Sequence, residues 1–264
     1  MQNQNNTWSS GNAYERFMGR WSTRIAQDFL GWLNIPPGKI WLDVGCGTGS
    51  LTKLILKKCQ PKEVISIDSS SEFISYAQKS IPDPIVRFQV GLAQALELDS
   101  NSIDVIVSGL VLNFVPQPET AIAEMIRVAK SGGTIGIYLW DYAEGMEMLR
   151  YFWDAAIELN DKATEFDEGI RFPLCQKGQL ESLVRKIGLK QVEAIPIEAT
   201  TVFQNFDDYW DPFLGNVGPG SIYNMGLSQN ERQQLQNRLR EALPIEDNGS
   251  ITLKARAWCV KGTT

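Results

Sequence analysis

The stretch that most constrains the fold is K-I-W-L-D-V-G-C-G-T-G at residues 39–49. A short apolar run, Ile40 to Val44, contains one carboxylate at Asp43 and leads into three glycines at alternate positions. A helical pattern begins near Ser50. A buried strand that turns through a glycine loop into a helix is typical of a nucleotide-binding site. The sequence therefore predicts such a site at this turn.

The spacing of the glycines indicates which nucleotide binds. The dinucleotide fingerprint G-x-G-x-x-G places its third glycine where this chain has Ser50, and no Lys-Ser or Lys-Thr pair closes the loop as in a P-loop. The pattern D-x-G-x-G-x-G instead resembles motif I of class I S-adenosylmethionine (SAM) dependent methyltransferases. SAM carries no phosphate, so the glycines would not serve to bind an anion. They would let the backbone approach the ligand closely. The resemblance implies cofactor contacts from Asp43, Gly45, Cys46 and Gly47.

Composition excludes several classes of function. The net charge of −6 argues against a nucleic-acid partner. The absence of histidine from the sequence excludes histidine triads and imidazole metal ligands. The four cysteines form no C-x-x-C pair, which argues against a zinc site and for reduced thiols. No apolar run is long enough to span a membrane and no signal-peptide pattern opens the sequence, so we expect a cytoplasmic protein without metal.

A second carboxylate follows the next predicted strand. The strand at 63–67 ends at Asp68, which lies 19 residues after Gly49. A carboxylate at this spacing, at the tip of the adjacent parallel strand, is placed to accept both ribose hydroxyls. The alternative is that Asp68 and Ser69 cap the following helix, with Ser69 and Glu72 forming a capping box. We assign Asp68 and Ser69 to the cofactor site.

The loop after the third predicted strand, 86–90, departs from the resembling family. Members of that family usually carry an acid here for the adenine amino group, and this chain has Leu92. The departure leaves adenine recognition to the backbone of Ala93 and to Gln94, whose side-chain amide offers both a donor and an acceptor.

The fourth predicted strand, 103–107, leads to S-G-L-V-L-N-F. Ligands of open parallel sheets bind outside the carboxyl ends of the strands. We therefore expect Ser108 and Gly109 to face the cofactor and Asn113 to face the transferred methyl group. This stretch also resembles the same methyltransferase subgroup.

The N-terminal region changes character along its length. Residues 1–12 are polar and are predicted to be disordered. The following Y-E-R-F-M-G-R-W resembles a stretch shared by a subgroup of these methyltransferases. The resemblance implies that Tyr14 and Arg20 cover the methionine end of SAM, with Arg20 pairing its carboxylate. The alternative is a helix that only packs over the sheet edge.

Strand and helix patterns alternate through residues 39–140, which predicts a parallel sheet with right-handed crossovers. Segments 190–200 and 249–261 alternate apolar and polar residues and predict two more strands. The resemblance implies that the last strand inserts antiparallel between the fifth and sixth. We predict an α/β fold with a doubly wound, mostly parallel, seven-stranded sheet, forming one Rossmann-like methyltransferase domain over 13–264. Residues 202–247 would be an insertion.

The insertion and the region before it contain the candidates for the acceptor site. The insertion is either a satellite cluster that seals the sheet edge or a lid with an aromatic acceptor pocket. The side chains assigned to substrate binding are Trp140, Tyr142, Tyr209 and Trp210. Asp141 is the best-placed general base in a chain without histidine, although it could equally cap the next helix. A carbon or amine acceptor needs no dedicated base.

The sequence thus predicts an enzyme that transfers a methyl group from SAM to a small-molecule acceptor by in-line displacement. It most resembles the methyltransferase type 11 subgroup, near the ubiquinone and menaquinone biosynthesis methyltransferases. Two alternatives stay open. Leu92 keeps a non-catalytic SAM-binding regulator possible, and an NAD-dependent oxidoreductase is disfavoured by the early third glycine.

Overall fold

The computed structural model describes residues 11–215 and 218–264, apart from the side chains of 11–18 and 20. Most of the segment predicted to be disordered, 1–12, therefore lies outside the described residues. The chain packs into two compact units, each described by itself below. Among the described residues, the sheet unit comprises 23–140, 177–197 and 257–264, and the helical unit comprises 11–22, 141–176, 198–215 and 218–256. The prediction of one domain over 13–264 stays a prediction.

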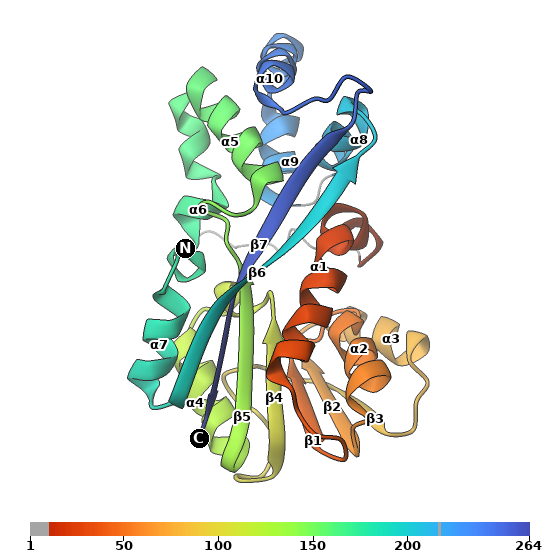
Figure 1. Cartoon of the computed structure of the whole chain (residues 1–264), viewed down its shortest axis with the longest axis vertical. Coiled ribbons are helices and arrows are strands. Elements are labelled where there is room, and N and C mark those ends of the chain that lie inside the picture. The colour runs from red at the N-terminus through yellow and green to blue at the C-terminus, as the bar shows by residue number, and fades with distance from the viewer. Residues whose placement is uncertain (1–10, 216–217) are drawn as a thin grey trace. The chain divides into compact units, whose positions relative to one another are not determined.

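Seven strands form one sheet in the order β3-β2-β1-β4-β5-β7-β6 (Figure 1). Their bounds are β1 Ile40–Val44, β2 Glu63–Asp68, β3 Val86–Val90, β4 Ile103–Gly109, β5 Ala129–Trp140, β6 Lys190–Phe203 and β7 Ile251–Thr263. The first five strands pair in parallel, and β7 pairs antiparallel with β5 from Thr134↔Thr263 to Trp140↔Ala257. The predicted sheet, including the insertion of the last strand between the fifth and sixth, is confirmed.

Two predicted boundaries are wrong. Gly132 and Gly133 predict a turn into a fifth strand at 134–139, but β5 begins at Ala129 and both glycines lie within it. Gly132 has φ +73°, and the pairing with β4 shifts register there. The helical spacing of Leu149, Phe152 and Trp153 predicts a helix that starts near Glu144. The helix begins at Glu147 instead, because a turn with a hydrogen bond from Gly145 N to Asp141 O precedes it. Glycines mark both irregularities, but apolar periodicity alone does not place them.

Helices cover the sheet unit. Their bounds are α1 Gly11–Leu33, which begins in the helical unit, α2 Ser50–Cys59, α3 Ser71–Ser80, α4 Pro118–Val128 and α7 Gln179–Ile187, with a short 3-10 helix at Leu112–Phe114. The helical spacing of Ala121, Ile122 and Met125 predicts that they form the inward face of α4, and all three are fully buried. Helices α4 and α7 contact each other and lie side by side in Figure 1.

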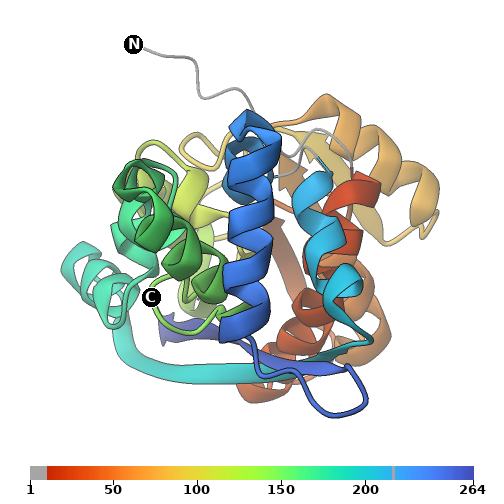
Figure 2. The ribbon, with the colours of Figure 1, turned by 90° about the horizontal axis from the view of Figure 1, so that it is seen from above.

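The helical unit has its own core. Its helices are α5 Glu147–Leu159, α6 Glu168–Arg171, α8 Phe206–Trp210, α9 Gly218–Gly226 and α10 Gln229–Ala242, with 3-10 turns at Asp161–Glu165, Pro173–Cys175 and Asp211–Leu214. In Figure 2, α10 (blue) runs beside α5 (green), and the two helices are in contact. The rings of Phe152 and Phe213 stack with centroids 4.2 Å apart. Ser228 followed by Glu231 predicts a capped helix, and these two residues form the capping box that starts α10. Within the described residues, no helix has both the length and the apolar character to cross a membrane.

Candidate functional site

The glycine loop at 45–49 joins β1 to α2 and has one packed side and one open side. A Cβ atom on Gly45, where φ is +76°, would lie 2.4 Å from Val111 Cγ1. A Cβ atom on Gly47, where φ is +53°, would meet no heavy atom of the described residues within 4 Å. Cys46 is buried, and burial raises the pKa of its thiol well above the usual range. The open face at Gly47 therefore offers backbone rather than a reactive side chain.

Asp68 reaches the glycine loop from the end of β2. Its Oδ2 accepts a hydrogen bond from Gly47 N at 2.9 Å, and its Oδ1 accepts from Ser70 N at 2.9 Å. The carboxylate therefore contacts the glycine loop, and its binding to the ribose hydroxyls stays a prediction. The capping box predicted for Ser69 and Glu72 is wrong. The Ser70 amide is bound by Asp68 Oδ1, and the N-cap of α3 is Ser70, whose hydroxyl accepts from Phe73 N.

A chain of buried polar groups lies beside the loop. Thr52 Oγ1 donates to Asp43 Oδ2 at 2.7 Å, and the Ser66 hydroxyl lies 2.8 Å from Thr52 Oγ1. Because the Thr52 proton goes to Asp43, Ser66 must be the donor to Thr52. Asp43 Oδ1 has no hydrogen-bond partner in the described part of the chain. Burial, with a smaller contribution from the Asp68 charge, raises the pKa of Asp43 to about 7. Thr52 and Ser66 carry no sequence signal that would have identified them.

The end of β4 adds two polar groups without internal partners. Ser108 is 1% exposed, and its hydroxyl, like Asn113 Nδ2, bonds to nothing in the described residues. Gly109 is required by packing, since a Cβ atom there would lie 2.4 Å from the Tyr138 hydroxyl. Leu110 has φ +61°, which costs free energy for a residue with a side chain. Unpaired polar groups and backbone strain at one strand end mark a candidate ligand contact.

The loop after β3 is held in place from α4. Arg127 Nη2 donates to the carbonyl of Leu96 at 2.8 Å, and Ala95 N donates to the carbonyl of Leu92 at 3.1 Å. The Leu92 side chain is 56% exposed. The loop that carries Ala93 and Gln94 is thus a fixed turn, and their contacts with adenine stay a prediction.

Asp141 lies in the helical unit and is 1% exposed. Arg256 donates to its Oδ2 from Nε at 2.8 Å and from Nη2 at 2.6 Å, while Oδ1 accepts from Glu144 N at 3.0 Å. Arg256 also pairs with the carboxylates of Glu144 at 3.3 Å and Glu198 at 3.7 Å. Both oxygens of Asp141 therefore hold a turn together, and its role as a base stays a prediction.

The aromatic side chains that the sequence assigns to the acceptor are buried. They are Trp140 at the end of β5 in the sheet unit, and Tyr142, Tyr209 and Trp210 in the helical unit. Tyr209 is 0% exposed, and its hydroxyl donates to the carbonyl of Met148 at 3.0 Å. This ring belongs to the core of the helical unit. Tyr14 and Arg20 lie in α1, with side chains outside the described residues.

Sequence comparison matches part of the chain to a known family. Residues 42–137 match the family model described as a methyltransferase domain. Over 124 residues the chain is 31% identical to 2-methyl-6-phytyl-1,4-hydroquinone methyltransferase of Synechocystis sp.. This aligned region covers 47% of this chain and 39% of that protein. The chain spans between 30% and 53% of the length of the first curated relatives it matches.

Solved structures show the same fold. The YcgJ protein of Bacillus subtilis superposes with a TM-score of 0.59 and 17% identity, over 91% of this chain and 98% of that chain. Phosphoethanolamine N-methyltransferase 2 of Haemonchus contortus, solved in complex with S-adenosyl-L-methionine, gives a TM-score of 0.60 and 16% identity over 96% of this chain and 56% of that chain. At identities this low, the similarity shows the fold alone. The superpositions confirm the predicted fold class.

Proposed function

We propose that the chain transfers a methyl group from SAM to a small-molecule acceptor, and the match of residues 42–137 to the model of a methyltransferase domain supports this proposal. The observation that carries the proposal is the contact between Asp68 and the glycine loop. The carboxylate is fixed by Gly47 N at the open face of the loop, where a diol could be bound. The 19-residue spacing from Gly49 to Asp68 is also that expected of a ribose-binding carboxylate at the tip of the adjacent parallel strand.

The residues of the sheet unit fit SAM. Each Asp68 oxygen accepts one N–H bond and retains a lone pair for a ribose hydroxyl. Gly47 leaves room for backbone approach, and the unpaired groups of Ser108 and Asn113 would bond the cofactor. Ala93 and Gln94 would hold adenine. Solved complexes of the same fold bind this cofactor, as in the Haemonchus contortus enzyme.

When bound, SAM supplies a methyl group already activated by its sulfonium, with a neutral thioether as leaving group. The chain then has mainly to align the acceptor with the methyl group and to exclude water, and alignment of this kind can be worth about 7 kcal/mol or more. Asn113 is the proposed contact at the methyl end. Asp141 is the proposed base for an acceptor that must lose a proton, but it would have to give up part of its ion pair with Arg256 to act.

The class of acceptor proposed is a small molecule. Its proposed contacts are the aromatic residues Trp140, Tyr142 and Trp210, whereas the ring of Tyr209 would support them from the core of the helical unit. The names of similar enzymes cover a hydroquinone and phosphoethanolamine. These acceptors differ in charge, size and the atom methylated, so the family supports the reaction and not one acceptor.

A thermal melt with SAM, S-adenosylhomocysteine and NAD in parallel tests the cofactor. A ligand at about 100 times its dissociation constant adds roughly 2.7 kcal/mol, which for a chain of this size raises Tm by roughly 5–10 °C. We expect this rise with SAM and its product. Asp68→Asn should abolish most of it, and Asp28→Asn, the same change at an exposed position of α1, should leave it intact. A rise with NAD alone would refute the proposal.

Turnover separates an enzyme from a SAM-binding regulator. Incubation with methyl-labelled SAM and a small-molecule extract should release labelled product with the wild-type chain and not with Asp68→Asn. A SAM-dependent rise in Tm without labelled product from any extract would favour the regulator.

A further inference from the structure

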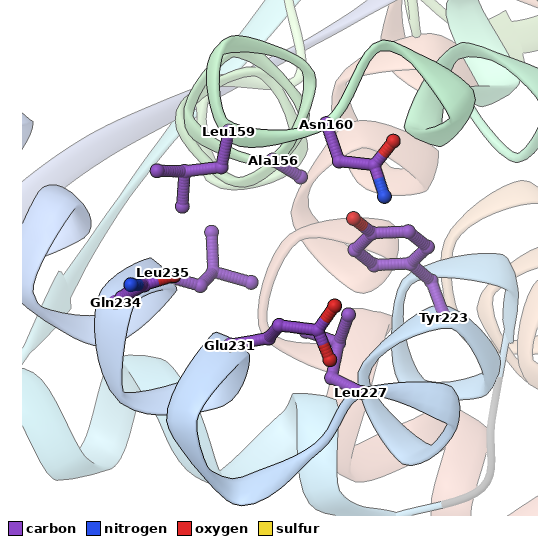
Figure 3. Close-up of a pocket in the computed structure, with 8 residues that line it drawn as sticks. All are labelled: Ala156, Leu159, Asn160, Tyr223, Leu227, Glu231, Gln234 and Leu235. Atoms are coloured by element: carbon purple, nitrogen blue, oxygen red, sulfur yellow. The ribbon is translucent and has the colours of Figure 1, made fainter.

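The helical unit contains a pocket that the proposed cofactor site does not use. It lies between α5, α9 and α10 and has a volume of about 160 Å³. Figure 3 shows the side chains that line it. Its apolar wall consists of Ala156, Leu159, Leu227 and Leu235. At about 30 Å³ for each water, this volume holds the equivalent of about five waters, which suits a ligand of a few carbon atoms.

The hydroxyl of one largely buried aromatic residue faces this space. Tyr223 is 9% exposed, and its ring is enclosed by Trp153 and Phe166 with centroids 5.7 Å and 5.5 Å away. Figure 3 shows the hydroxyl end of Tyr223 directed into the pocket, between Asn160 and Glu231. Among the described residues, no protein group hydrogen-bonds this hydroxyl. A hydroxyl without an internal partner that faces a pocket is free to hydrogen-bond a ligand or water there.

The charge at the pocket is negative. Glu231 is the sole charged side chain among the residues that line it, as far as the chain is described. Its Oε2 accepts from Ser228 N at 2.8 Å and from the Ser228 hydroxyl at 2.6 Å, and these bonds lower the pKa of Glu231. The carboxylate thus stays ionised at neutral pH. Burial and the nearby Glu231 charge raise the pKa of Tyr223, so its hydroxyl stays neutral.

We propose that this pocket is a binding site for a small alkylammonium ion. The ammonium group would donate to the Glu231 carboxylate and to the Tyr223 oxygen, and its short alkyl chain would pack against the leucines. A carboxylate ligand would be repelled by Glu231, and an alcohol would lack the charge attraction. The proposal does not depend on methyl transfer, because binding of the amine needs no SAM.

Three ligands with one carbon skeleton test the proposal: isopentylamine, isopentanol and isovalerate. Each is titrated into the full chain without SAM at about pH 7 and followed by amide chemical shifts in NMR. We expect saturable shifts in α9 and α10 with isopentylamine, with a Kd on the order of 1 mM. The alcohol should bind several-fold more weakly, and isovalerate should not bind.

Matched variants locate the interaction. Glu231→Gln keeps the capping box, since Gln serves at this position, and should weaken amine binding roughly 3- to 5-fold without changing binding of the alcohol. Tyr223→Phe should weaken amine binding by about 2- to 10-fold. Glu241→Gln, an exposed change on the same helix, is the control and should have no effect.

Three results would overturn the proposal. One is the absence of saturable shifts with isopentylamine at about ten times the expected Kd. Another is equal affinity for the amine, the alcohol and the acid. The third is equal weakening by the Glu231 and Glu241 variants. All three are independent of the melt and turnover measurements with SAM.

Discussion

Replacement of Asp43 by Asn tests the electrostatics of the glycine loop. Asp43 is 1% exposed, receives one hydrogen bond from Thr52, and faces no cation that would stabilise its ionised form in the described residues. The folded chain therefore binds a proton at Asp43 that the unfolded chain releases. Asn has nearly the same shape and keeps an oxygen for the Thr52 hydroxyl, so the change removes the titration with little effect on packing.

The direction and size of the expected change in stability follow from the pKa of Asp43, which burial raises from 3.8 to about 7. Between these two values the folded state holds more protons than the unfolded state, so stability falls as the pH rises through this window and levels off above pH 7. Three pKa units correspond to about 4 kcal/mol in total, of which about 2–3 kcal/mol falls between about pH 5 and 8. The Asn variant should gain this amount relative to wild type across that range.

Urea unfolding at fixed ionic strength, at several pH values from about 5 to 8, measures the difference between the two chains. Burial also raises the pKa of Glu168 to about 7, so Glu168 makes stability fall over the same pH range. Both proteins contain Glu168, so its contribution cancels in the difference between them. Asp28→Asn is the control. A difference between Asp43→Asn and wild type that varies by less than about 0.5 kcal/mol across the range would refute the raised pKa.

Two further changes test the loop and the turn after β5. Gly45→Ala should lower the free energy of unfolding by about 2–4 kcal/mol, because the new Cβ atom clashes with Val111 and φ is positive. Gly47→Ala meets open space and should lower it by about 1 kcal/mol through its positive φ alone. Equal losses for the two variants in urea unfolding would contradict the packing described. Asp141→Asn should cost about 2–3 kcal/mol because it leaves Arg256 short of one buried carboxylate, and adding Arg256→Met should recover much of this loss. Loss of turnover at unchanged stability would instead indicate that Asp141 is the base.

The sheet and the heart of the loop site could be predicted because both follow from local rules. Alternating strand and helix patterns dictate a parallel sheet, and the carboxyl ends of neighbouring parallel strands meet at one edge. That rule alone brings Asp68 to Gly47, although 21 residues separate them. The insertion of β7 beside β5 came from family resemblance rather than from any pattern in the strand itself.

The remaining features depend on contacts that no local pattern encodes. Asp141 and Arg256 are 115 residues apart, and nothing in either neighbourhood predicts their ion pair. The hydroxyls of Thr52 and Ser66 lie in segments that look simply apolar, so their bond network could not be expected. The shift of the α3 cap from Ser69 to Ser70 arises because Asp68 uses the Ser70 amide, a choice that two adjacent serines cannot reveal.

The double anchoring of Asp68 has a calorimetric consequence. Gly47 N and Ser70 N already hold the carboxylate in one rotamer, so the free protein has lost this side-chain entropy before any ligand arrives. Cofactor association at this carboxylate should then have a heat-capacity change that matches the apolar area the ligand itself buries, with no added contribution from ordering the loop. The glycine loop would act as a rigid receptor. Differences in cofactor affinity would then appear in the dissociation rate, and binding would show no slow conformational phase.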